Sequence, residues 1–129
     1  MRALIVPADL SKPMRVENIT AEMDELQELV GGHFQVIGLG SLKAVMCLDE
    51  EGKLKSGVQP NVRATDMVSY YTASGDIIMG DVVVLGPFDG DVNADLSEET
   101  INDLIFGPSN RQPDVEVTLP LSEWLKSEP

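Results

Sequence analysis

The stretch Asp76-Ile-Ile-Met-Gly-Asp-Val-Val-Val-Leu85 carries the strongest β-strand signal in the chain. Its three consecutive valines, at 82–84, have stiff side chains that pack well on a pleated sheet. Because the stretch is almost entirely apolar, it predicts a central strand whose two faces are both covered. Gly80 interrupts the run and marks a bulge or a break in that strand. We therefore expect a fold built around a sheet with this stretch at its centre.

Shorter apolar or alternating segments predict the other strands. The first, Arg2–Val6, is apolar and stops at Pro7, and the next segment alternates apolar and polar residues, so the two could form a hairpin. A turn at Asp49-Glu-Glu-Gly52 could bring the following segment back as the second arm of another hairpin. The predicted strands before the central one cover residues 2–6, 14–19, 34–37, 44–48 and 53–58.

Two segments have the 3.6-residue period of amphipathic helices. In residues 20–30 the apolar side chains fall on one face, the first turns are acidic, and Gly31 stands where a left-handed residue commonly ends a helix. The second helix is expected to begin after Ser97, whose hydroxyl can cap it, and to direct its apolar residues toward the core. A shorter helix is expected at about residues 65–71.

Together these elements predict an α+β protein with a single domain at residues 1–107. Its sheet is expected to be mixed or mainly antiparallel, with two main helices packed against it. Residues 108–129 are expected to form a C-terminal extension, which consists of a linker, an edge strand at 115–119 and a short terminal helical turn.

Acidic side chains are concentrated in the second half of the chain. The 129 residues carry a formal net charge of −13. Residues 1–65 contain seven basic and nine acidic side chains, whereas residues 66–129 contain two basic and thirteen acidic ones. Such an anionic surface keeps a protein soluble, and it can also speed association with a basic partner. It argues against direct binding to nucleic acid, which requires clustered Lys and Arg.

Targeting and redox features favour the cytoplasm. No apolar run approaches the ~18–20 residues of a membrane span, and no charged and then apolar leader opens the chain. The single cysteine, Cys47, cannot form an internal disulfide and suits a reducing compartment. We therefore expect a cytoplasmic protein without membrane contact, while the oligomeric state is not indicated.

Side chains that could perform catalysis or hold a metal are scarce. The one histidine, His33, could act on Cys47 only if the fold brought them together, and Cys47 lies in an apolar segment typical of a buried thiol. The loop from Asp89 has oxygen ligands at alternate positions, as in a calcium loop. However, Ala94 and Thr100 stand where such a loop needs Gly and a bidentate Glu. We expect no metal, no cofactor and no catalytic residue, so a non-enzymatic role is favoured.

The polar stretch Pro60-Asn-Val-Arg63, interpreted as a loop, is the remaining candidate site. A fixed guanidinium such as that of Arg63 suits a ligand's carboxylate or phosphate. The structural alternative, which we favour, is an ion pair between Arg63 and a carboxylate of the same chain.

Five short motifs follow one another along the chain: Ala3-Leu-Ile-Val6, Val30-Gly-Gly-His-Phe-Gln-Val36, Asp49-Glu-Glu-Gly-Lys53, Pro60-Asn-Val-Arg-Ala64 and Gly75-Asp-Ile-Ile-Met-Gly-Asp-Val-Val-Val84. In this order and spacing they resemble a small family of tailed phages, actinobacteria and other bacteria, known only as a domain of unknown function. The resemblance covers about residues 2–105, although the family often has Asn at the position of Asp49. It implies no established activity, but it implies a small cytoplasmic protein that a phage could encode. Asn61 and Arg63 match the family's polar loop.

Two functional hypotheses follow. The first is a non-enzymatic interaction protein, such as a phage accessory factor, that binds a basic surface of a host protein, with a mimic of DNA as a special case. It would act in the cytoplasm, which for a phage-encoded protein is that of the host. The carboxylates assigned to this acidic surface are Asp89, Asp91, Asp95, Glu98, Glu99 and Asp103.

The second hypothesis is a domain that binds a small ligand or a divalent metal, with hydrolysis as a further step. It would use Asn61 and Arg63 together with Asp81. Such a site requires a concave pocket with convergent polar groups.

Overall fold

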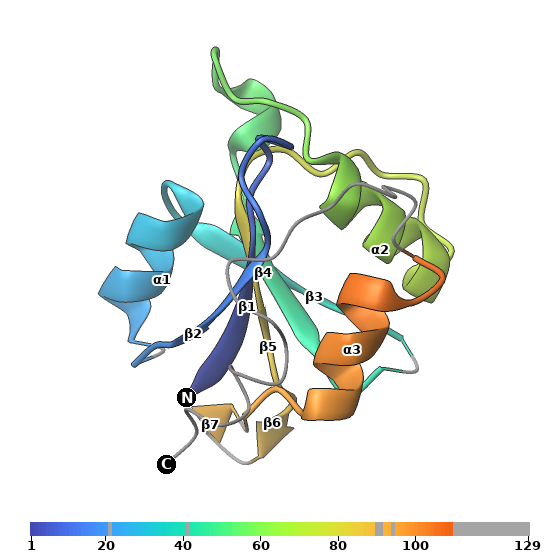
Figure 1. The fold of residues 1–129 in the computed structure, drawn as a ribbon. Coiled ribbons are helices and arrows are strands. Elements are labelled where there is room, and N and C mark those ends of the chain that lie inside the picture. Colours follow the sequence, from blue (N-terminus) through green and yellow to red (C-terminus); the bar gives the residue numbers. More distant parts are fainter. Residues whose placement is uncertain (21, 41, 90–91, 94, 110–129) are drawn as a thin grey trace.

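A five-stranded antiparallel sheet lies between two layers of helices (Figure 1). The computed structural model describes residues 1–20, 22–40, 42–89, 92–93 and 95–109. The strand order is β2-β1-β5-β4-β3, and a separate pair of short strands, β6 and β7, follows it in sequence. The strands are β1 (Arg2–Val6), β2 (Arg15–Asn18), β3 (Phe34–Gly38), β4 (Val45–Asp49), β5 (Val82–Leu85), β6 (Phe88–Asp89) and β7 (Val92–Asn93). The helices are α1 (Met23–Val30), the 3₁₀ turn η1 (Gly52–Leu54), α2 (Val62–Thr72) and α3 (Glu98–Phe106).

The central strand is β5, as the valine run predicts. It pairs with β1 on one side and with β4 on the other, and all four of its residues are buried. The strand is shorter than expected, because it begins only at Val82. Gly80 has φ +81°, a left-handed conformation that separates the segment 76–79 from the start of β5. The proposed break at Gly80 is therefore confirmed, and residues 76–79 lie outside the sheet.

Alternation along the strands divides the apolar side chains between two cores. Val82 and Val84 of β5 belong to the larger core, which α2 and α3 cover, whereas Val83 and Leu85 belong to the smaller core beneath α1. Figure 1 shows the same arrangement, with α1 on one side of the sheet and α2 and α3 on the other. The α+β class and the antiparallel sheet are confirmed.

The helix α2 is longer than the sequence predicts. It corresponds to the short helix expected at 65–71, has 11 residues and is the longest helix described. It begins at Val62, because the side chain of Asn61 accepts a hydrogen bond from the backbone N–H of Ala64 and so caps it. The interpretation of 60–63 as a loop is therefore wrong for its last two residues.

Other boundaries also differ from the prediction. Residues 53–58 do not return as a strand, since the chain after β4 forms η1 and then a turn. The ends of α1 and α3 agree better, with Gly31 left-handed after α1 and Ser97 capping α3 through Thr100 N. Residues 110–129, and with them the predicted strand at 115–119, lie outside the described residues. None of the helices in the described part of the chain has the length and hydropathy to span a bilayer.

Candidate functional site

The three residues singled out for a ligand site lie together in the fold, but they hold the backbone of the protein. Asn61 is 0% exposed. Its Nδ2 donates to the carbonyl oxygens of Val6 and Gly80, both at 2.9 Å, while its Oδ1 accepts from Ala64 N. This one amide therefore joins the end of β1, the start of α2 and the segment before β5. Every polar atom of the side chain is used in these bonds.

Arg63 has a similar role in the loop between β1 and β2. Its side chain is buried with 2% exposure, and Nη2 donates to the carbonyl oxygens of Pro7, Asp9 and Lys12 at 2.8–2.9 Å. The predicted structural role is present, but the bonds run to carbonyls, and the expected direct ion pair is replaced by longer-range attraction. Burial lowers the pKa of Arg63, while the charges of Asp9 and Asp81 act in the opposite direction.

Asp81 completes this cluster from the segment before β5. Its Oδ1 accepts a hydrogen bond of 2.9 Å from the N–H of Ala8, in the same loop that Arg63 holds. Asp81 is exposed, in contrast to Asn61 and Arg63. The cluster thus fixes the loop between β1 and β2 and leaves almost no surface of its two buried members for a ligand.

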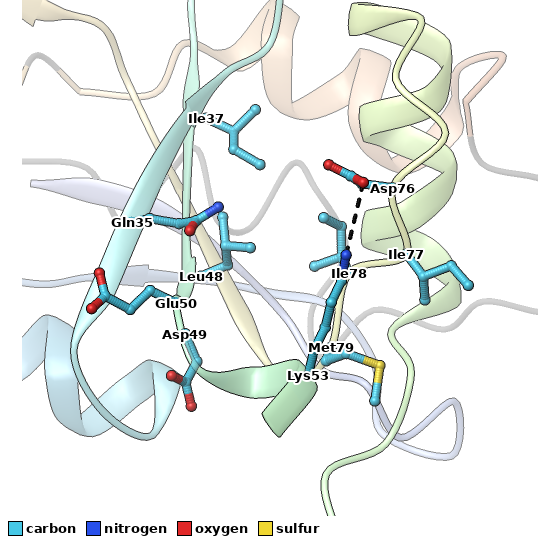
Figure 2. A pocket seen from close by; sticks show the side chains of 10 residues that line it. All are labelled: Gln35, Ile37, Leu48, Asp49, Glu50, Lys53, Asp76, Ile77, Ile78 and Met79. Carbon is cyan, nitrogen blue, oxygen red and sulfur yellow. Dashed lines mark ion pairs between the residues drawn. The ribbon is translucent and has the colours of Figure 1, made fainter. Parts of the chain in front are cut away.

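A pocket lies elsewhere, between the β3–β4 hairpin and the segment 76–79 (Figure 2). Its volume is about 230 Å³. Figure 2 shows Gln35 and Glu50 on one side of the pocket, and Lys53 and Asp76 on the other. The apolar part of the lining comes from both the hairpin and the segment opposite it. The lining residues are Gln35, Ile37, Leu48, Asp49, Glu50, Lys53, Asp76, Ile77, Ile78 and Met79.

The charges around this pocket are unequally satisfied. Lys53 Nζ lies 3.8 Å from Asp76 Oδ1, and both side chains are well exposed, so this pair is weak. Asp49, by contrast, is buried and bonds to the ammonium of Lys55. Burial raises the pKa of Asp49, but the Lys55 bond, helped by a hydrogen bond from Glu51 N, outweighs it and holds the pKa below its ordinary value.

Glu50 is the carboxylate of the pocket that remains unpaired among the described residues. It is exposed at the end of β4, beside Gln35 in Figure 2. Since Lys55 is bonded to Asp49 and Lys53 lies near Asp76, the unpaired Glu50 leaves the rim with a net negative charge. Sequence reasoning missed this pocket because residues 49–52 were interpreted only as a turn and Asp76 as the first residue of the central strand. The available signal was Gln35, a polar residue within a strand.

Only some of the carboxylates assigned to the acidic surface from the sequence belong to residues whose side chains the structure describes. Glu98 and Glu99 are exposed in the first turn of α3, where their negative charges interact favourably with the positive end of the helix dipole. Asp103 is half-buried on the same helix. Asp95 Oδ1 accepts a 2.8 Å hydrogen bond from Arg2 N, so this carboxylate also fastens the start of β1. Asp91 lies outside the described residues, and for Asp89 only its backbone place in β6 is described.

A second acidic surface lies on α1, and a comparison of the net charges of the two halves of the chain does not reveal it. The helix α1 and the residue before it contribute four carboxylates and no cation, although the first half of the sequence is nearly neutral. These residues lie on the opposite side of the sheet from α3 (Figure 1). The four residues are Glu22, Asp24, Glu25 and Glu28.

His33 and Cys47 do not form a catalytic pair. Cys47 is buried under α1, and burial raises the pKa of its thiol to about 11. His33 is exposed, and its Nδ1 lies 3.5 Å from Nε2 of Gln27. Within the described residues no group of three or more His, Cys, Asp or Glu side chains is placed to hold a metal ion.

Comparison with known proteins identifies the family of this chain but no characterised relative. The curated proteins and the solved structures give no match. The family model of a domain of unknown function, DUF3846, matches residues 1–106, which include every strand and helix described above. The resemblance seen in the sequence motifs is thereby confirmed, and the chain belongs to the DUF3846 family.

Proposed function

We propose that this protein is a non-enzymatic interaction domain that binds a protein with a basic surface. The observation that carries the proposal is the charge on its helices. Among the described residues, α1, α2 and α3 expose carboxylates, and the only cation on any of them, Arg63, is buried. Both helical layers therefore present a negative potential, which steers and orients a basic partner.

Three cations of the described strands and loops are paired with carboxylates and so do little to offset this potential. Lys55 is bound to Asp49, Arg15 to Glu17, and Lys53 lies near Asp76. Each of these pairs neutralises a carboxylate locally and leaves the helical surfaces unchanged. With Glu22, the helices α1 and α3 thus contribute seven carboxylates that no cation of the same helices offsets.

A partner that normally holds DNA is one form of this proposal. Carboxylates on α3 and around it would then occupy positions that phosphates take in the partner's basic cleft. We place the encounter in the cytoplasm, and for a phage-encoded protein in that of the host. The buried Cys47, with its raised pKa, fits a chain that depends on no disulfide.

The alternative, a ligand or metal site at Asn61 and Arg63, has less support. The polar atoms that would contact a ligand donate to backbone carbonyls inside the fold. A screen by thermal shift with nucleotides and divalent ions tests it. A ligand-induced rise in melting temperature that Asp81→Asn abolishes would restore the alternative.

A pair of charge-matched variants tests the proposed function. Immobilised protein is incubated with a bacterial lysate at low and at physiological salt, and retained proteins are identified by mass spectrometry. We expect a retained protein of basic isoelectric point whose binding falls steeply with salt. The double variant Glu98→Gln, Asp103→Asn should weaken retention. The double variant Asp24→Asn, Glu28→Gln removes the same amount of charge from α1, so a comparison of the two shows whether α3 is the specific surface.

Two results would overturn the proposal. One is the absence of any basic protein in the retained fraction at low salt. The other is a retained basic protein whose binding is the same for the wild type and for both charge variants, since the acidic helices would then contribute nothing.

A further inference from the structure

The two edges of the five-stranded sheet are protected to different degrees. At the β2 edge, Pro13 precedes the strand, and Arg15 pairs with Glu17 within it. The β3 edge, Phe34-Gln-Val-Ile-Gly38, contains neither charge nor proline, and no other described strand pairs with its outer side. Natural sheets use charges and prolines to prevent pairing at an edge. The absence of both from β3 leaves an edge that is open to another strand.

The pairing of β3 with β4 identifies the backbone groups at this open edge. The N–H of Glu50 donates to the carbonyl of His33, so the odd-numbered residues of this ladder bond to β4. In an antiparallel pair the residues between them turn their backbone groups the other way. The residues whose N–H and C=O face outward are therefore Phe34, Val36 and Gly38.

The pocket described above lies directly beside this edge. Gln35 and Ile37, the two β3 residues in its lining, are the ones whose side chains share a face of the sheet with α2 and α3. A residue opposite them on an added antiparallel strand would have its Cβ about 4.5–5.5 Å away on that same face. Its side chain would thus be directed along the pocket.

The lining of the pocket suits a long cationic side chain. Its apolar part, formed by residues such as Ile37, Leu48 and Ile78, can cover the aliphatic stem of Lys or Arg. Figure 2 shows the unpaired carboxylate of Glu50 beside Gln35 at the outer side of the rim, away from Lys53, where its charge would attract the charged end of such a side chain. On the other face of β3, Val36 is 42% exposed and offers contact to an apolar residue of the added strand.

We propose that β3 binds an extended basic segment of the partner by strand addition, with a Lys or Arg side chain in the adjoining pocket. This inference rests on the proposed function and names the binding mode of its basic partner. A second copy of this chain is a poorer occupant, because each copy carries a net charge of −13 and β3 itself offers no compensating cation.

A titration followed by nuclear magnetic resonance tests the inference directly. The probe is an acetylated and amidated Lys-Val-Lys-Val-Lys peptide, and Glu-Val-Glu-Val-Glu is the charge-reversed control. We expect the amide signals of Phe34, Val36 and Gly38 to shift with the basic peptide only. No shift up to millimolar peptide, or shifts confined to the acidic helices, would overturn the inference.

Variants at the two edges supply the matched comparison. Val36→Pro removes an outward N–H, which an edge strand tolerates, and should weaken peptide binding about tenfold or more. Asn18→Pro makes the same change at the outward position of β2 and should leave binding within about twofold. Glu50→Gln should weaken binding about twofold to threefold at low salt. Circular dichroism verifies that each variant is folded, and Glu50→Gln keeps the test decisive if Val36→Pro is not.

The outcomes separate this inference from the proposed function. If Val36→Pro retains the basic lysate protein as well as the wild type does, strand addition is wrong and the interaction function stands. If the peptide binds at β3 but no basic protein is retained, the proposed function fails at the level of the natural partner. A dimer in light scattering that Val36→Pro converts to a monomer would show that the occupant is a second copy, and would overturn the proposal.

Discussion

Replacement of Asn61 by alanine should be one of the most damaging single changes in this protein. The substitution removes the cap of α2, which costs about 1 kcal/mol in typical helices. It also removes the donor for the buried carbonyl oxygens of Val6 and Gly80, and each unsatisfied group costs about 1 kcal/mol or more. The expected loss in the free energy of unfolding is about 3 kcal/mol, a large part of the 5–15 kcal/mol typical of a domain.

Ser97→Ala is the matched control for this experiment. Ser97 caps α3 through Thr100 N in the same way that Asn61 caps α2 through Ala64 N, but Ser97 is exposed and holds no distant backbone. Its loss should therefore cost only the local bonds at the start of α3, the cap itself and the hydrogen bond that Ser97 Oγ donates to Thr100 Oγ1, about 1 kcal/mol. The difference of about 2 kcal/mol between the two variants measures what the buried amide contributes beyond capping.

Urea unfolding followed by far-ultraviolet circular dichroism provides the assay. With a slope of about 1.5 kcal/mol per molar urea, Asn61→Ala should lower the midpoint by about 2 M and Ser97→Ala by about 0.7 M. Equal shifts for the two variants would refute the reasoning, because Asn61 would then act as a cap alone. Unequal slopes would instead indicate a change in the unfolded or native ensemble.

Three further predictions concern other residues. Because the pKa of Asp49 lies below its unfolded value of about 3.9, Asp49 contributes stability above about pH 4 that is lost as pH falls through the folded pKa. In a plot of the urea midpoint against pH, Asp49→Asn should therefore lose less stability than the wild type at acidic pH, and an identical acidic decline in both proteins would contradict the prediction. The thiol of Cys47, with a pKa of about 11, should react with iodoacetamide at pH 8 far more slowly in native buffer than in urea, as measured by mass spectrometry. Gly40 has φ +58°, and a Cβ there would lie 2.0 Å from Tyr71 O, so Gly40→Ala should destabilise the protein by at least about 2 kcal/mol more than Gly57→Ala, where φ is +81° and no atom lies within 4 Å. Similar urea midpoints for these two glycine variants would show that the chain around Gly40 relaxes easily.

The core of the fold could be predicted from the sequence because its signals are local. The apolar run at 82–84 indicates a central strand, and Gly31 and Ser97 mark helix ends through backbone chemistry that acts within a few residues. The prediction of a strand at 53–58 was wrong, because the sequence pattern there is weak. In the structure the chain forms the short turn η1 after β4 instead.

The partners of Asn61 and Arg63 could not be predicted, since they are distant in sequence. Asn61 bonds to a carbonyl 55 residues away, and Arg63 bonds to carbonyls 51–56 residues away. The local sequence indicates only a polar loop, and for Arg63 it indicates a carboxylate partner rather than backbone carbonyls. The one available signal was Asn61 itself, because Asn before a helical period is a strong capping residue. The pocket beside β3 was equally hidden, because the segment 76–79 that closes it comes from far along the chain.

The position of β5 at the centre of the sheet has a consequence for the order in which the protein can form during synthesis. The β1–β2 and β3–β4 hairpins consist of neighbours in sequence, whereas β5 is the strand that joins them. Until Leu85 has left the ribosome, the two hairpins have no shared sheet and their apolar faces have no common core. Folding therefore waits for a late strand and includes a loop closure of some eighty residues. A nascent chain stopped short of 82–85 should be a substrate for chaperones or proteases rather than a smaller version of the domain.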